Sequence, residues 1–226
     1  MKILGYSERG IINSLIFSIV ESSNNNDLMD EFIYLMNIPG LNESEKPNNY
    51  EILLEQSFSD FGDADLVIIL DYDNCKKALF IEGKVNTFTT TKWSLDRQYR
   101  EYLEDKNSSN LFFQLYQKSN LFKHKEDILL DSKSSIPSKV RDRKIGDNPI
   151  VWKAFKKIEE CNKAFYVGLV PSPKQDNEAF NEKLDYKIHF LSWEQVHNFC
   201  KDNKEKLFKV LEMFEYNKGQ IYKPNL

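Results

Sequence analysis

The chain of 226 residues is poor in the residues that build disulfide frameworks, zinc sites and phosphate-binding loops. Its three cysteines, Cys75, Cys161 and Cys200, are far apart and form no CxxC pair, which argues for a reducing compartment and against structural zinc. With 8 glycines, the sequence contains neither GxGxxG nor GxxxxGK[ST]. We therefore expect no nucleotide cofactor.

Long apolar runs and an excess of positive charge are also missing. No segment approaches the ~18 consecutive apolar residues of a membrane span, and the first residues do not resemble a signal peptide. These absences predict a cytoplasmic protein without a membrane partner. The 31 Lys and Arg against 35 Asp and Glu give a net charge of −4, so any contact with nucleic acid must come from a local basic patch.

Hydrophobic residues are nevertheless plentiful, at 41% of the chain with 13% aromatic residues, which is enough for a substantial core. The length predicts a single domain over residues 1–226, with a core of about 6–200 and a C-terminal helix over 203–217. Hydrophobic periodicity predicts further helices and strands. The helices are expected at 7–20, 27–37, 92–103, 109–121 and 192–200, and the strands at 50–58, 65–70, 78–85, 164–170 and 186–191.

This order of elements predicts an α/β fold with a mixed central β-sheet flanked by helices. The run DLVIIL (65–70) is typical of a strand buried on both faces, and the turn after it predicts a hairpin with 78–85. Strand 50–58 carries two glutamates and is expected at an edge. The polar segment 132–149 is expected to be a long loop.

Charged residues interrupt two of these strands at one end of the predicted sheet. Asp65 opens the run DLVIIL, and Glu82 and Lys84 lie on one face of the strand that follows. Because a hairpin joins the strands, Asp65 can lie beside Glu82. Two close carboxylates repel each other unless a cation or a proton lies between them, and Mg²⁺ prefers carboxylate ligands. The pattern favours a Mg²⁺ site, although a salt bridge on a strand face explains the same spacing.

The same residues resemble the PD-(D/E)XK nuclease superfamily. GDADLVI followed by FIEGKV is similar to the paired motif of that family, with Asp65 as its Asp and residues 82–84 as its ExK. Ala64 replaces the proline of the motif, and Asp63 is an alternative first Asp. The resemblance covers residues 6–103 and implies a restriction-endonuclease-like core in which strands 65–70, 78–85 and 164–170 share one sheet.

The resemblance also implies a reaction, the Mg²⁺-dependent hydrolysis of phosphodiester bonds in DNA, with Mn²⁺ as a substitute. Asp65, Glu82 and the backbone carbonyl of Gly83 would hold the metal ion. Lys84 would position or help deprotonate the attacking water and stabilise the charge that grows on the phosphate. The biological setting, whether restriction, defence or repair, stays open.

Two helical residues extend the resemblance. YSERGIINSL is similar to the N-terminal core helix of the family, where an acid such as Glu8 would bind a second metal ion or its water; the alternative is a first-turn acid that offsets the helix dipole. RQYREY is similar to the QxxxY signature of bacterial recombination helicase-nucleases, in which Gln98 would steady the scissile phosphate. A glutamine on a charged helix can equally be only solvated.

Positive charge is concentrated in one part of the chain. Between residues 118 and 157, 11 Lys and Arg face 5 acids, a local charge of +6. We expect the polar segment within it to contact DNA phosphates through four residues: Lys139, Arg141, Arg143 and Lys144. The alternative path uses the helix after the ExK strand, through Lys92, Arg97 and Arg100.

Two other functions fit the same sequence. The first is a catalytically silent protein with the nuclease fold that acts as a nucleic-acid-binding or regulatory module. The second is an unrelated α/β interaction protein in which ExK is a coincidence. The oligomeric state is open, with a homodimer as one alternative.

Overall fold

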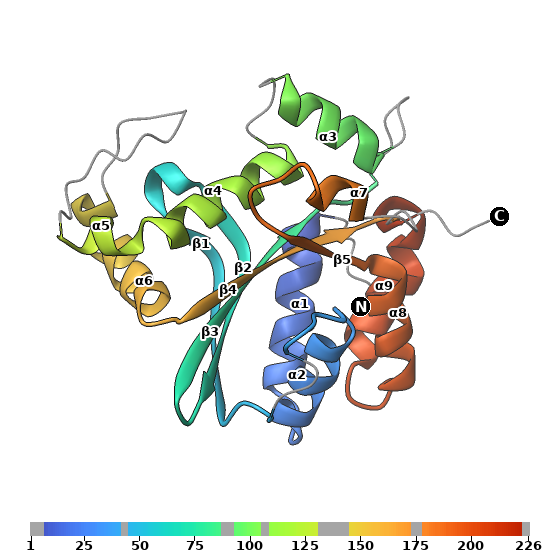
Figure 1. The fold of residues 1–226 in the computed structure, drawn as a ribbon. Helices are drawn as coiled ribbons and strands as arrows, with labels where there is room; N and C mark the ends of the chain where they lie inside the picture. The colour runs from blue at the N-terminus through green and yellow to red at the C-terminus, as the bar shows by residue number, and fades with distance from the viewer. Residues whose placement is uncertain are drawn as a thin grey trace.

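The computed structural model describes residues 7–41, 45–86, 93–104, 109–130, 145–172 and 178–222. In these residues five strands form one mixed sheet in the order β1-β2-β3-β4-β5 (Figure 1). Strands β1 to β3 pair antiparallel, whereas β4 pairs parallel to β3 and β5 parallel to β4. The strands are β1 (Asn49–Ser57), β2 (Asp63–Tyr72), β3 (Cys75–Gly83), β4 (Lys163–Val170) and β5 (Ile188–Ser192).

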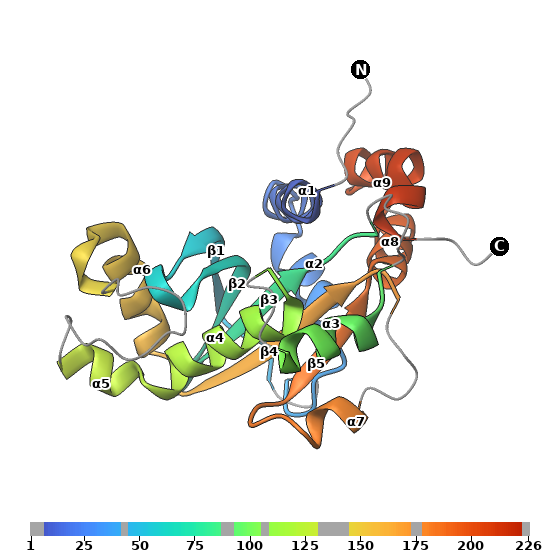
Figure 2. The ribbon, with the colours of Figure 1, turned by 90° about the horizontal axis from the view of Figure 1, so that it is seen from above.

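Helices cover both faces of this sheet, as Figure 2 shows from above. One face packs against α1 (Glu8–Val20), α2 (Asn25–Tyr34), α8 (Trp193–Asp202) and α9 (Phe208–Ile221). The other face packs against α3 (Leu95–Leu103), α4 (Leu111–Lys123), α5 (Lys125–Leu130), α6 (Pro149–Glu159) and α7 (Glu178–Asn181). Two short 3₁₀ turns complete the elements, η1 (Ser59–Phe61) and η2 (Ile145–Asp147). The predicted α/β class with a mixed, helix-flanked sheet is confirmed.

The hairpin of β2 and β3 forms the centre of the sheet because both strands are apolar on both faces. From Leu66 to Leu70 every side chain is buried, and successive residues alternate between the two hydrophobic layers. The register begins at the turn, where Tyr72 lies opposite Cys75, and its last pair is Leu66 with Ile81. The next position along this register brings Asp65 opposite Glu82 at the far end of the hairpin.

Strand β4 joins the sheet beside β3, as the resemblance implies for strand 164–170. Its register places Gly168 next to Glu82 and Leu169 next to Gly83. The acidic end of the hairpin is therefore inside the sheet and not at an edge, because β4 and β5 lie beyond it. Strand β1 lies at one edge of the sheet, as predicted, and β5 lies at the other.

The first helix begins as its sequence predicts. The Ser7 hydroxyl caps it by accepting a hydrogen bond from the Gly10 N–H at 3.1 Å, and its apolar stripe is buried from Ile11 to Ile19. The buried stripe ends one residue before the helix does, because Val20 is 47% exposed.

Helices α5 and α6 lie where the sequence predicts no helix. Of the loop predicted over 132–149, residues 132–144 lie outside the described residues. The rest contains the short turn η2, and α6 begins at Pro149. The Asn148 side chain caps α6 by accepting from the N–H groups of Ile150 and Val151, and proline fits a first turn that needs no N–H. Among the described helices, none has the length and apolar character needed to cross a membrane.

Candidate active site

The candidate site lies at the end of the β2–β3 hairpin, between the first turn of α1 and the middle of α4. Asp65 is 4% exposed, and its Oδ2 accepts a hydrogen bond from the Gly83 N–H at 2.8 Å. Its Oδ1 accepts from Nε of Arg9 on α1 at 3.2 Å. The pairing of β1 with β2 skips the position opposite Asp65, where Glu55 has a φ of 48°. This local distortion of the edge strand lies directly beside the aspartate.

Glu82 is the most deeply buried acid of the site, with no exposed surface. Its Oε1 lies 3.5 Å from Nζ of Lys118, which projects from α4 and is also 0% exposed. Among the described residues, no hydrogen-bond donor reaches either oxygen of Glu82. Burial raises the pKa of Glu82 and the Asp65 charge raises it further, while the Lys118 charge opposes both. The influence of Asp65 shows that the two carboxylates are close enough to interact.

Lys84 follows β3 immediately, and contacts from three elements fix it. Its Nζ donates to Oε1 of Gln114 on α4 at 2.6 Å. Its backbone N–H donates to the Leu169 carbonyl at 2.8 Å, and its own carbonyl accepts from Nε1 of Trp193 at 2.7 Å. The position of this lysine therefore depends on β4 and α8 as well as on its own strand.

Gly83 lets α1 approach the end of β3 closely. A Cβ at this position would lie 2.9 Å from Cβ of Glu8 and 3.1 Å from Cδ1 of Ile12. Glu8 therefore lies directly above the strand end, on the core-facing side of its helix, where the sequence predicts it. Its role as a metal ligand stays a prediction.

We expect Gly83→Ala to destabilise the fold by about 1–3 kcal/mol, because the added methyl group must push back the first turn of α1. Urea unfolding measures this change in free energy. Gly219→Ala is the matched control. Gly219 lies in α9 with no atom within 4 Å of an added Cβ, so alanine there should stabilise the helix by up to about 1 kcal/mol. Equal effects of the two substitutions would contradict the close approach of Glu8.

Gln98 has a structural role that the sequence does not show. It is 8% exposed, and its Oε1 accepts from the N–H of Leu111, at the start of α4, at 3.0 Å. Its Nε2 donates to Glu101 on its own helix at 3.3 Å, and its backbone carbonyl accepts from the Asn110 amide. The amide that contacts Lys84 is instead that of Gln114. Contact of Gln98 with a phosphate stays a prediction.

The predicted DNA-contacting residues are only partly within the described chain. Lys139, Arg141, Arg143, Lys144 and Lys92 lie outside the described residues. Arg97 lies on α3, where its Nε is 3.7 Å from Glu101.

Several lysines of the basic region are paired within the protein. Lys157 contacts Glu51 at 2.8 Å, Lys156 contacts Glu159 at 3.1 Å, and Lys125 donates to backbone carbonyls. These pairs reduce the charge that this part of the described surface offers to DNA.

Three residues of the site were not predicted from the sequence: Arg9, Gln114 and Lys118. Lys118 was counted only as part of the basic region, although it lies in a helix between apolar residues at 115 and 121, a pattern that would have indicated a core-facing position. Arg9 contacts the carboxylates of Asp65, Asp63 and Glu55 at 3.2 to 4.0 Å, and no local pattern indicates this grouping.

The donor set fits Mg²⁺ better than a metal that needs a protein cage. Among the described residues, no three or more His, Cys, Asp and Glu side chains are grouped to hold a metal ion. Mg²⁺ is commonly held by one or two carboxylates, with water and substrate phosphate completing the shell. Asp65 and Glu82 supply this number, and among the described residues the oxygens of Glu82 accept no short hydrogen bond.

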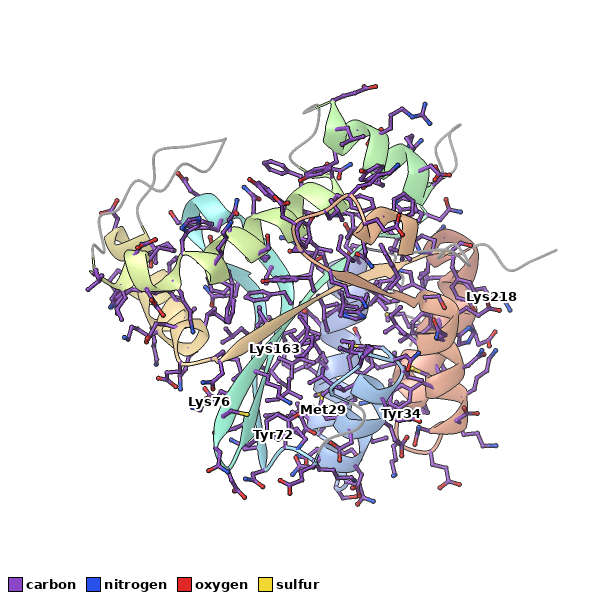
Figure 3. The ribbon with its side chains drawn as sticks, viewed as in Figure 1. Met29, Tyr34, Tyr72, Lys76, Lys163 and Lys218 are labelled. Atoms are coloured by element: carbon purple, nitrogen blue, oxygen red, sulfur yellow. The ribbon has the colours of Figure 1, made fainter. Side chains whose placement is uncertain are left out.

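The large pockets of the described surface lie elsewhere. One of about 900 Å³ is lined by α2, α8 and the turn end of the β2–β3 hairpin, which is the end opposite the candidate site. Its lining includes Tyr34 and Tyr72, which Figure 3 shows on the side of the molecule away from α3. Another of about 490 Å³ lies between α4 and the start of β4, near Lys163. Neither is lined by Asp65, Glu82 or Lys84. The candidate site is a strand end between two helices and lies outside both of these pockets.

No family model, curated protein or solved structure matches this chain. The functional argument therefore rests on the site itself.

Proposed function

We propose that this protein is a Mg²⁺-dependent nuclease of the PD-(D/E)XK type, with a restriction-endonuclease-like core, that hydrolyses phosphodiester bonds of DNA in the cytoplasm. The observation that carries the proposal is the end of the β2–β3 hairpin. There a fully buried Glu82 with unbonded oxygens lies next to Asp65, and Lys84 follows one residue beyond Gly83. Apolar side chains can replace a buried pair of this kind, Glu82 with Lys118, without loss of stability, so a functional role explains Glu82 better.

Asp65, Glu82 and the carbonyl of Gly83 would hold Mg²⁺, which when bound supplies positive charge against the phosphate and lowers the pKa of water. The other roles belong to side chains of the chain itself. Lys84 offers a positive N–H donor to the phosphate oxygens as their charge grows. Gln114 holds that ammonium through its amide oxygen, and among the described residues no other hydrogen bond of the Lys84 side chain competes with binding to substrate.

A polymeric substrate agrees with the position of the site. Small-molecule enzymes commonly place their chemistry in a pocket of about 300–1,000 Å³. The pockets of that size described above lack the three charged residues of the site. A nucleic-acid backbone can reach a site at a strand end between two helices without entering either of these pockets.

Digestion of plasmid, linear duplex and single-stranded DNA by the purified full-length chain tests the proposal. We expect cleavage with Mg²⁺ or Mn²⁺ and none with a chelator. RNA of the same sequence serves as the substrate control. Intact substrates under all metal conditions would contradict nuclease activity.

A specific observation favours a second function, that of a catalytically silent nucleic-acid-binding module. Arg9 reaches Asp65 from α1, and Lys118 reaches Glu82 from α4, so each carboxylate already has a cationic partner, and the two partners come from opposite faces of the sheet. A silent module would bind the same DNA without cutting it and would show no change in affinity with Mg²⁺. Gel-shift titrations beside the digestion assay separate the two functions.

A further inference from the structure

Lys118 is the residue of the site that is hardest to explain as packing. Its side chain has no exposed surface, although a buried ammonium costs several kcal/mol unless close partners compensate it. It donates to the Phe61 carbonyl at 2.8 Å and lies 3.5 Å from Glu82. No other donor among the described residues forms a hydrogen bond to either oxygen of Glu82. Lys118 is therefore the cation that faces this carboxylate.

This geometry differs from that of a structural buried ion pair. Such a pair is favourable when its geometry is excellent and further hydrogen bonds satisfy the remaining lone pairs. At 3.5 Å, the contact between the ammonium and the carboxylate of Glu82 lies at the outer limit of hydrogen-bond length, so charge attraction dominates it. Glu82 thus has a counter-charge, while no donor among the described residues makes a short hydrogen bond to its oxygens. A cation ligand needs its lone pairs in this state before its ion arrives.

The charges around Lys118 belong to the same site. Burial lowers the pKa of Lys118, whereas the negative charges of Glu82, Asp63 and Asp65 act in the opposite direction. The Lys118 ammonium therefore interacts with Glu82 and Asp65, the two carboxylates that would hold the divalent cation in the proposed function, and also with Asp63.

We infer that the Lys118 ammonium is the resident cation of the metal-free site, and that a divalent cation binds Glu82 only by displacing it. This inference rests on the proposed function, because it assumes that Glu82 is a metal ligand. The Phe61 carbonyl on turn η1 accepts from Lys118 at 2.8 Å, and this contact does not involve Glu82. The displaced ammonium thus keeps an anchor beside the site. Competition of this kind lowers metal affinity and makes activity depend on the free metal concentration.

Calorimetric titration with Mn²⁺ at pH 8 tests the competition. We expect Lys118→Met to bind Mn²⁺ at least tenfold more tightly than the unsubstituted protein, because the repulsion between ammonium and metal is removed. Lys118→Arg, which keeps the charge, should bind no more tightly than the unsubstituted protein. Lys123→Met is the matched control on the exposed part of the same helix and should leave the affinity unchanged. Equal or weaker binding by Lys118→Met would overturn the inference while leaving the metal site in place.

A measurement on the unsubstituted protein covers the case in which Lys118→Met does not fold. The side-chain ¹⁵N resonance of Lys118, assigned by its loss in Lys118→Arg, should move on titration with Mg²⁺ in step with occupancy. A resonance that stays in place at saturating Mg²⁺ would overturn the displacement. If neither the unsubstituted protein nor a folded Lys118→Met binds Mn²⁺, the metal site of the proposed function fails, and the inference fails with it.

Discussion

Replacement of Lys84 by alanine is expected to reduce DNA cleavage by about 10³-fold, with the fold intact. The backbone of Lys84 keeps its hydrogen bonds to Leu169 and Trp193, because neither involves the side chain. Only the ammonium is lost, and with it the donor that meets the growing charge on the phosphate. Single-turnover cleavage at saturating DNA, with circular dichroism to check folding, measures the effect.

Two further variants make this prediction specific. Lys209→Ala, on the exposed surface of α9, should cut at the unsubstituted rate. Gln114→Leu removes the acceptor that positions Lys84, so we expect a smaller loss in kcat, of about tenfold, with little change in KM. Gln114→Glu, which keeps an acceptor oxygen, should recover most of it. A Lys84→Ala protein that cuts at the unsubstituted rate would remove Lys84 from the site.

Substitution of Glu82 by glutamine is expected to lower the free energy of unfolding by about 3–5 kcal/mol, because it leaves the Lys118 ammonium buried without its counter-charge. The sequence argument alone gives the opposite sign, since removing one of two crowded carboxylates should relieve repulsion. The structure reverses that expectation by placing a cation beside Glu82. Urea unfolding of the metal-free protein measures the change.

The double variant Glu82→Met with Lys118→Met should regain most of this loss, because apolar side chains of similar length replace the whole pair. Asp65→Asn is the comparison within the site. It keeps an acceptor for the Gly83 N–H and loses only the partly exposed ion pair with Arg9, so it should cost less than about 1 kcal/mol. Additive losses in the double variant would show that Glu82 and Lys118 do not interact.

The central sheet could be predicted because its signals are local. The run from Leu66 to Leu70 is apolar throughout, and the polar turn after Tyr72 requires the chain to reverse. Helix α6 was not predicted, although Asn148 before Pro149 is a strong start signal and Val151, Ala154, Phe155 and Ile158 form an apolar stripe. The predicted loop over 132–149 ends where this helix begins, so the start signal at Asn148 and Pro149 marks the boundary between loop and helix.

The site could be predicted only where its residues share one hairpin. Asp65, Glu82 and Lys84 follow from strand alternation, since their spacing fixes their faces. Lys118 could not be paired with Glu82 in this way, because the contact depends on how α4 packs across the sheet, 36 residues later in the chain. The hydrogen bond between Gln98 and the Leu111 N–H has the same origin, because it depends on how the start of α4 lies beside α3.

The parallel pairing of β3 with β4 has a consequence for how the protein matures. The hairpin of β2 and β3 is local and can form early, whereas β4 begins at Lys163, after the chain has passed through α3 to α6. Contacts of such high sequence separation form slowly, because the chain entropy lost in closing the loop precedes the gain. Trp193, whose Nε1 donates a hydrogen bond to the carbonyl of Lys84, is synthesised later still. A ribosome-bound chain therefore carries Asp65 and Glu82 long before it carries β4 and Trp193, and the candidate site is incomplete until both have been added.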